Sequence, residues 1–153
     1  MSRMNARLLF ISTPWLLAAL AMLLAPVCLA EDGKPEIVMV AHQDVATTSL
    51  NRDTARAMFA MRQRTWPNGQ ALRVFVLPND HSAHERFAKQ GLSVYPHQLQ
   101  LSWDRVVFSG TGQAPTTVTS QIEMLERIAN IPGSLGYIDR EHLDDRVQVI
   151  SME

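Results

Sequence analysis

The sequence predicts an α/β fold, because segments with the pattern of strands alternate along it with segments of helical pattern. Residues 36–42 (EIVMVAH) and 71–77 (ALRVFVL) are short apolar runs without a helical period, which is typical of buried strands. Residues 121–130 instead repeat their apolar side chains at three- and four-residue intervals, as an amphipathic helix does. This alternation indicates a sheet with crossover connections and flanking helices.

The first half of the chain predicts three helices around the second strand. Asn51 is placed to cap a helix over 52–62, with a stripe formed by Ala55, Met58, Phe59 and Arg62. A Pro-Asn-Gly turn at 67–69 then leads into the strand at 71–77. A short helix follows from Ser82 to near Gly91. The next helix, over 95–108, has one apolar side made of Leu99, Trp103, Val106 and Val107.

The second half predicts a loop, one helix and two strands. Residues 109–115 (SGTGQAP) form a glycine-rich loop, and Ser120 with Glu123 has the spacing of a capping box. The buried stripe of the helix that follows is expected to contain Ile122, Leu125, Ile128 and Ala129. A turn and strand over 131–139 and a last strand over 146–151 close the chain. We find no internal repeat, and the length predicts one domain.

The amino terminus has the layout of a secretory signal peptide. Arg3 and Arg7 precede an apolar stretch from 8 to 24, and Cys28 and Ala30 occupy the small-residue positions of a cleavage site. We therefore expect residues 1–30 to be a signal peptide and residues 31–153 to be a periplasmic domain. The alternatives are an uncleaved anchor, since the apolar stretch is nearly long enough to span a membrane, and a lipoprotein attached through Cys28. Val27 disfavours the lipoprotein.

Cleavage after Ala30 would leave a domain that has no cysteine and is weakly acidic. The leader holds two of the 14 basic residues and none of the 15 acidic residues, so the remaining formal charge is near −3. This balance argues against a nucleic-acid binder or a binder of anionic membranes. It does not exclude an anion site, because backbone amides can form one.

Three stretches follow patterns of a known family in the expected order. They are residues 50–78 (LNRDTARAMFAMRQRTWPNGQALRVFVLP), 95–115 (YPHQLQLSWDRVVFSGTGQAP) and 124–139 (MLERIANIPGSLGYID). Together they resemble the phosphate-type periplasmic substrate-binding proteins, the solute receptors of ABC transporters, and most closely a short branch of that family. The resemblance implies a class II periplasmic-binding fold, in which ligand lies between two α/β lobes. Full-length receptors are more than twice as long, so we expect a single lobe, or a reduced two-lobe form, with a mixed sheet flanked by helices.

The resemblance also implies a function. It predicts a periplasmic solute-binding protein, without a cofactor, for a small oxyanion such as phosphate. An ABC transporter permease or another envelope protein would be its partner, with no membrane insertion after cleavage. The alternative is a single-lobe interaction or sensor protein that has lost the ligand cleft.

The first candidate site is PNDHSAHERF, residues 78–87, at the start of a predicted helix. Alignment with phosphate receptors places Asp80 on an anion-site Asp, and Ser82, Ala83 and His84 on a Ser-Gly-Thr turn. Helix-terminal amides favour an anion, and Ser82 and protonated His84 would add hydrogen bonds. Pro78 stands where the family has the Arg that binds the anion, and this difference weakens the prediction of an anion site. The competing interpretation is a plain helix cap at Asp80 or Ser82, with Glu85 completing a capping box.

A metal site is a weaker interpretation of the same segment. His81 and His84 are three residues apart and Glu85 follows them, yet zinc sites normally need three or four protein ligands. His42, at the end of the first strand, would have to approach through the fold. We therefore assign no metal ligand.

The second candidate site is the loop of Ser109, Gly110 and Thr111, whose amides and hydroxyls suit an oxyanion. No Gly-Lys-Ser/Thr follows, so it is not a Walker loop. A third hydroxyl cluster at 47–49 contributes Thr48. Ligands of open α/β sheets favour the carboxyl ends of strands, and we expect all three segments there.

The aromatic residues Trp66, Trp103, Phe108 and Tyr137 fit core packing better than a ligand box. No nucleophile elbow or paired-carboxylate motif is present, so we do not expect an enzyme.

Overall fold

The structure is a computed structural model that describes residues 33–153. The expected signal peptide, and with it the alternatives of an anchor or a lipid attachment, lies outside the described residues. Among residues 33–153, no helix has both the length and the apolar character needed to cross a membrane.

The strands form one mixed sheet in the order β2-β6-β1-β5-β3-β4. They are β1 (Ile37–His42), β2 (Ser49–Leu50), β3 (Arg73–Val76), β4 (Thr116–Thr117), β5 (Ser134–Asp139) and β6 (Val147–Met152). β1 is antiparallel to both of its neighbours, β5 and β6, whereas the pairs β3–β5, β3–β4 and β2–β6 are parallel. The mixed α/β sheet expected from the sequence is thus confirmed, and β3, β4 and β5 end at one edge, which we call the carboxyl edge.

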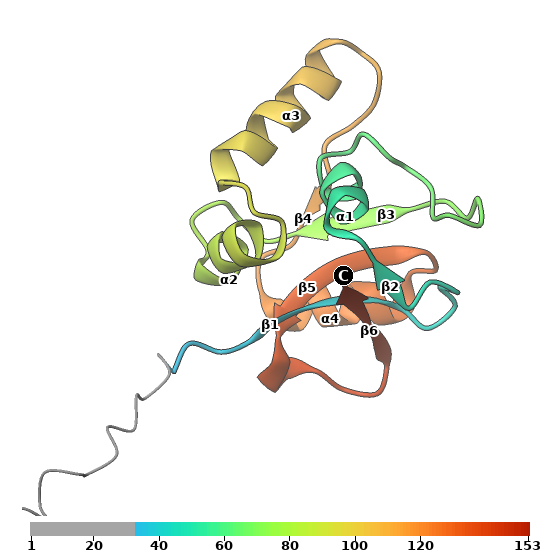
Figure 1. Cartoon of the computed structure of the whole chain (residues 1–153), viewed down its shortest axis with the longest axis vertical. Coiled ribbons are helices and arrows are strands. Elements are labelled where there is room, and N and C mark those ends of the chain that lie inside the picture. The colour runs from blue at the N-terminus through green and yellow to red at the C-terminus, as the bar shows by residue number, and fades with distance from the viewer. Residues whose placement is uncertain (1–32) are drawn as a thin grey trace, which may run out of the picture. The chain divides into compact units, whose positions relative to one another are not determined.

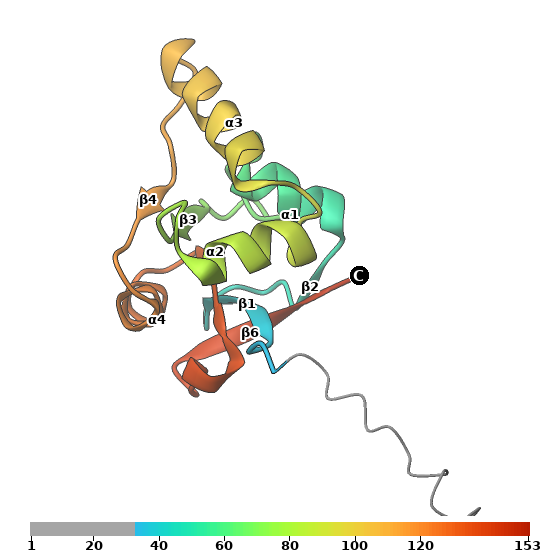
Figure 2. The same cartoon turned by 90° about the vertical axis from the view of Figure 1, so that its left-hand side faces the viewer.

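The helices lie on both faces of this sheet (Figures 1 and 2). They are α1 (Arg52–Phe59), α2 (Ser82–Arg86), α3 (Pro96–Phe108) and α4 (Gln121–Asn130), with a π-helical turn at Phe87–Gly91 and a 3-10 turn at Arg140–His142. α2 runs without a break into the π-helical turn. α4 packs along β5 and β1, and α1 and α2 lie on the opposite face.

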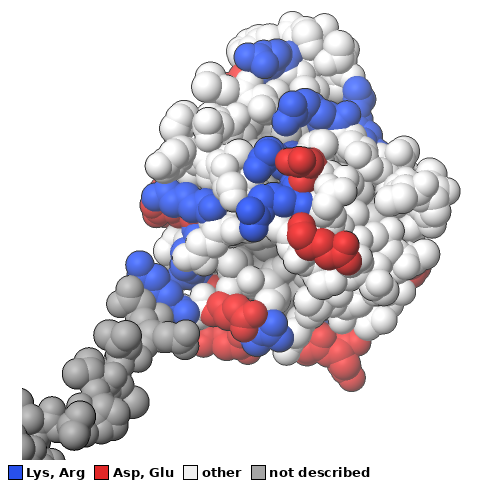
Figure 3. Space-filling model, in the orientation of Figure 1, with Lys and Arg blue, Asp and Glu red and all other residues white. Residues whose placement is uncertain are grey.

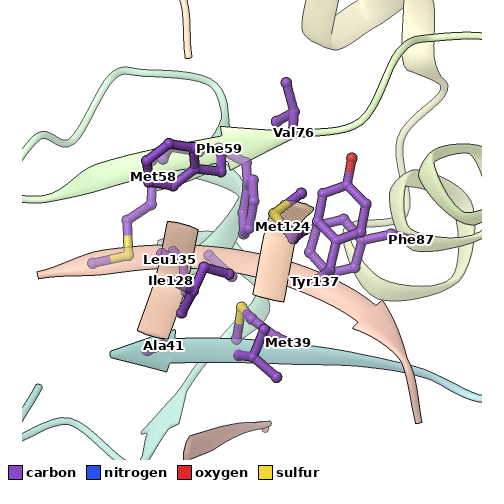
Figure 4. Close-up of a cluster of buried hydrophobic side chains, with 14 of the residues drawn as sticks. Met39, Ala41, Met58, Phe59, Val76, Phe87, Met124, Ile128, Leu135 and Tyr137 are labelled. Carbon is purple, nitrogen blue, oxygen red and sulfur yellow. The ribbon is translucent and has the colours of Figure 1, made fainter. Parts of the chain in front are cut away.

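Adjacent residues of β5 show why the two faces carry different helices. Successive side chains of a strand point to opposite faces. At Gly136, a Cβ would lie 2.6 Å from Ile128 and Met124 of α4, so glycine permits the close approach of that helix. Tyr137, on the other face, stacks on Phe87 with ring centroids 4.1 Å apart (Figure 4). The core therefore lies on both sides of β5.

The helix starts confirm two of the expected caps and correct the third. Asn51 accepts a hydrogen bond from the Thr54 amide at 2.8 Å, and Ser120 accepts one from the Glu123 amide at 3.1 Å. α2 is capped by His81, whose Nδ1 accepts from the Ala83 amide. The expectation that Asp80 or Ser82 would cap α2 was wrong, because the helix begins one residue after His81.

Several apolar residues lie outside the core that the sequence predicted. Trp66, Trp103 and Tyr137 are buried as expected, but Phe108 is 88 % exposed. It is the last residue of α3, and Val107 beside it is also exposed. Ile122 is exposed as well, because the buried arc of α4 is formed by Met124, Leu125 and Ile128. Arg62 lies beyond the end of α1 and is exposed.

Candidate functional site

Two helices begin at the carboxyl edge. A loop from Leu77 to His81 joins β3 to α2, and a loop from Val118 to Ser120 joins β4 to α4. Helix starts present backbone N–H groups that have no partner inside the helix, and their dipoles favour negative charge. Ligands of open α/β sheets bind at such edges, so this edge is the place to look for a site.

A largely buried ion pair lies at this edge, between α2 and the end of β5. Arg86 of α2 donates to the carboxylate of Asp139, the last residue of β5, and their side chains are 15 % and 5 % exposed. Gln121 of α4 donates to the same carboxylate at 2.8 Å and accepts from the Asp139 amide at 2.6 Å. The cluster ties two helices to the sheet. It also neutralises the guanidinium of Arg86, which is therefore not free to clamp an anion.

His84 is fully buried and serves the fold. Its Nδ1 is hydrogen-bonded to the hydroxyl of Tyr137, and that hydroxyl accepts from the Leu77 amide at 2.9 Å. Burial, with a smaller effect of nearby His81, lowers the pKa of His84 to about 4. Burial likewise raises the pKa of Tyr137. The expected charge-assisted bond from a protonated His84 side chain does not follow, because the ring is neutral at pH 7 and faces Tyr137.

Ser82 and Asp80 remain at the surface of the edge. Both are exposed, and neither side chain makes a hydrogen bond to another residue in 33–153. The Ala83 amide is bonded to His81 Nδ1 at 3.1 Å, and the Glu85 amide to the His81 carbonyl at 3.1 Å. The backbone amides of Ser82 and His84 have no such acceptor in the described part of the chain. Ser82 is exposed, so an anion at this edge would meet its amide and its hydroxyl, whereas the amide of the fully buried His84 is not accessible.

The Ser109–Thr111 loop follows α3, the helix that extends away from the sheet (Figures 1 and 2), and caps the carboxyl end of that helix. Its three amides donate to the carbonyls of Arg105, Val107 and Val106, at 3.0 to 3.2 Å. The hydroxyls of Ser109 and Thr111 are 2.8 Å apart, and Arg64 donates to the Thr111 carbonyl at 2.5 Å. A helix carboxyl end carries partial negative charge, so this setting favours cations such as Arg64.

Thr48 is remote from both of these segments. It precedes β2, the strand at the far side of the sheet, and its carbonyl accepts from the Ser151 amide at 2.9 Å. Four strand spacings separate β2 from β3, about 19 Å. The structure therefore brings together Asp80, Ser82 and His84, and it separates them from Thr48 and from the loop of Ser109, Gly110 and Thr111. The expectation that all three segments meet at the carboxyl ends of strands was wrong. Thr48 follows β1, which runs against the other strands, and the loop of Ser109, Gly110 and Thr111 follows α3 and precedes β4.

Three side chains that could bind a metal, which the sequence analysis missed, lie at the end of β5 and directly after it. Donor atoms of Asp139, Glu141 and His142 lie within 4.8 Å of one another. Asp139, however, already binds Arg86 and Gln121, and the nearby guanidinium opposes a cation. The earlier alternative of His81, His84 and Glu85 is not assembled, since each of these side chains has another partner: the Ala83 amide, Tyr137 and Lys89, respectively.

Hollows in the surface lie away from Ser82. One of about 800 Å³ is at the amino end of β3, between residues 70–75, residues 113–116 and the end of α4. Another, of about 360 Å³, lies between β1, β6 and the π-helical turn. Neither hollow is lined by Asp80 or Ser82.

Neither a protein-family model nor a curated protein matches the sequence, but solved structures do match the fold. An ABC-type phosphate transport receptor from Vibrio cholerae is 15 % identical with a TM-score of 0.60, over 77 % of this chain and 46 % of that one. A putative phosphate ABC transporter substrate-binding protein with bound phosphate from Clostridium perfringens is 11 % identical with a TM-score of 0.62, over 77 % and 45 %. PstS from Borrelia burgdorferi is 10 % identical with a TM-score of 0.60, over 78 % and 47 %.

These matches identify the architecture. The chain spans less than half the length of each of these receptors, and its single mixed sheet has the fold of one lobe of their type. The expectation of a single periplasmic-binding lobe is confirmed at the level of the fold.

Proposed function

We propose that this protein is a periplasmic solute-binding lobe that takes a small oxyanion, with phosphate as the first candidate, at its carboxyl edge. The observation that carries the proposal is the start of α2 at Ser82, after the loop that follows β3, in a lobe shaped like those of phosphate receptors. Ser82 would donate through its hydroxyl and its amide. The Asp80 carboxylate would accept a hydrogen bond from a protonated oxygen of the anion.

The same geometry sets the strength of binding. Pro78 follows Leu77 where the resembling family has an arginine, and Arg86, the arginine nearest to Ser82 in sequence, is neutralised by Asp139. A hydrogen bond to a charged group contributes roughly 1.5–3 kcal/mol, so its loss weakens binding about 10- to 100-fold. We therefore expect weak binding by an isolated lobe, strengthened where a second lobe or an envelope partner, such as a transporter permease, covers the edge.

Calorimetry with inorganic phosphate and sulfate at millimolar concentration tests the proposal. Ser82→Ala should weaken phosphate binding about 10- to 100-fold, since it removes one hydrogen bond to a charged ligand. Ser109→Ala is the matched control, because Ser109 is an exposed serine at the carboxyl end of α3, and it should leave binding unchanged. Absence of heat and of any thermal shift would refute the oxyanion site. Equal effects of the two substitutions would show that Ser82 is not part of it.

A second candidate function is an interaction lobe without a small ligand. The neutralised Arg86 favours it, as does the exposed position of Ser82 outside the two hollows described above. A protein without heat of binding for either anion, yet retained by an envelope partner through the carboxyl edge, would establish this alternative.

A further inference from the structure

The outward face of α3 exposes two large apolar side chains. Leu101 is 59 % exposed and Phe108 is 88 % exposed. They are seven residues apart, which places them on the same side of a helix with 3.6 residues per turn. The opposite side holds the buried residues Leu99 and Trp103, and Trp103 Nε1 donates to the Phe59 carbonyl at 2.8 Å. α3 extends away from the sheet in both views (Figures 1 and 2), so its outward face is accessible.

Two opposite charges lie between these apolar residues. Asp104 and Arg105 fall on the outward half of the helix, between Leu101 and Phe108. Arg105 is exposed and forms no ion pair within residues 33–153, and Asp104 accepts only from Gln100, at 2.8 Å, among the contacts described. Basic side chains are spread over the upper part of the face seen in Figure 3, which includes α3. The intramolecular surroundings therefore leave the charge of Arg105 without an acidic partner.

The order of these four residues is self-complementary when the helix direction is reversed. The pattern Leu-x-x-Asp-Arg-x-x-Phe over 101–108 has apolar residues at its ends and opposite charges at its centre. When two such helices lie antiparallel about a twofold axis, Leu101 faces the second copy's Phe108. Asp104 then faces the second copy's Arg105. Each contact occurs twice, as twofold symmetry requires.

We propose that this protein self-associates through an antiparallel pairing of α3 with α3 of a second copy. The two apolar contacts lie about 10 Å apart along the helix, from a rise of 1.5 Å per residue, and the charge pairs lie between them. A contact made by one helix face belongs to the small, transient class of interfaces. The association goes beyond the proposed anion site, because it does not use the carboxyl edge.

Sedimentation equilibrium tests the pairing with variants whose charges are reversed. Protein concentrations from about 10 to about 500 μM cover the affinities of transient complexes. D104R places like charges opposite each other in a self-pair, and so does R105D, and each should weaken self-association about tenfold or more. An equimolar mixture of the two variants should associate again, because the two acidic side chains of one chain then face the two basic side chains of the other. Phe108→Asp should weaken the dimer, and mixing it with D104R or with R105D should not restore the association.

Ile122→Glu is the matched control. Ile122 is an exposed apolar residue on α4 (64 % exposed), so its replacement should leave the association unchanged. Circular dichroism on each variant establishes that the substitutions, all at exposed or half-buried positions, preserve the fold. A wild-type protein that is monomeric throughout the concentration range would overturn the proposal. So would a mixture of D104R and R105D that stays monomeric while wild type associates, or a dimer that survives Phe108→Asp.

Discussion

Acidification from pH 7 to pH 5 should destabilise the fold through His84. The side chain is fully buried and bonded to the Tyr137 hydroxyl, and its pKa is lowered from 6.5 to about 4. In the unfolded chain the imidazole is solvated and takes up a proton near pH 6.5. The unfolded state therefore binds more protons than the folded state as the pH falls from 6.5 towards 4, and stability decreases in that window.

The size of the effect follows from the two pKa values. At pH 5 the unfolded histidine is almost fully protonated, whereas the folded one is still neutral. The resulting loss in the free energy of unfolding is about 2 kcal/mol at pH 5 and about 3 kcal/mol at pH 4. Such a loss is a large fraction of the stability of a small domain. Glu36 and Glu123, whose pKa values are lowered below 4.5, contribute mainly at lower pH, so the interval from 7 to 5 isolates the histidines.

Urea unfolding at pH 7, 6 and 5 measures this dependence. His84→Gln replaces the ring by a side chain that does not titrate but can still bond to Tyr137, and its stability should change by about 2 kcal/mol less than that of wild type over the interval. His97→Gln, at an exposed position of α3, should keep the wild-type dependence. If His84→Gln showed the same loss on acidification as wild type, His84 would not be the buried neutral group described above.

Two further substitutions test how the elements are held together. Arg86→Leu should cost about 3–5 kcal/mol in denaturant unfolding, because it leaves the buried Asp139 carboxylate without its cation; a smaller loss with Asp139→Asn added would show the coupling, and a neutral single substitution would contradict it. Gly133→Ala should cost more than Gly110→Ala. Both glycines have positive φ (72° and 69°), but a Cβ at Gly133 would lie 2.3 Å from the Ala71 carbonyl oxygen, whereas Gly110 faces open space. Equal melting temperatures for these two variants would refute the steric explanation.

The sequence predicted most of the elements, because local rules govern them. The apolar run of β1 and the stripe of Ala55, Met58 and Phe59 on α1 are properties of short windows. The caps at Asn51 and Ser120 depend on residues three positions away. These features, and the alternation of strands with helices, therefore follow from the chain without knowledge of its neighbours.

The sequence indicated the position of the candidate site along the chain but not the contacts that its side chains make. The sequence indicated Asp80 and Ser82 after a strand, and the structure places them at a strand end and a helix start. It could not show that His84 turns inward to Tyr137, 53 residues away, or that Arg86 is neutralised by Asp139, also 53 residues away. Both are long-range contacts between α2 and β5. A signal for them would have required knowledge that these two elements are neighbours.

By itself the sequence determined the elements and the mixed α/β character, because periodicity, capping and turns are local. Tertiary structure decided which of the candidate residues share a site. The reversed direction of β1 sends Thr48 to the opposite edge, and the loop of Ser109, Gly110 and Thr111 uses its amides to cap α3. Strand direction and the use of backbone donors are set by pairing between distant parts of the chain, which no short window contains.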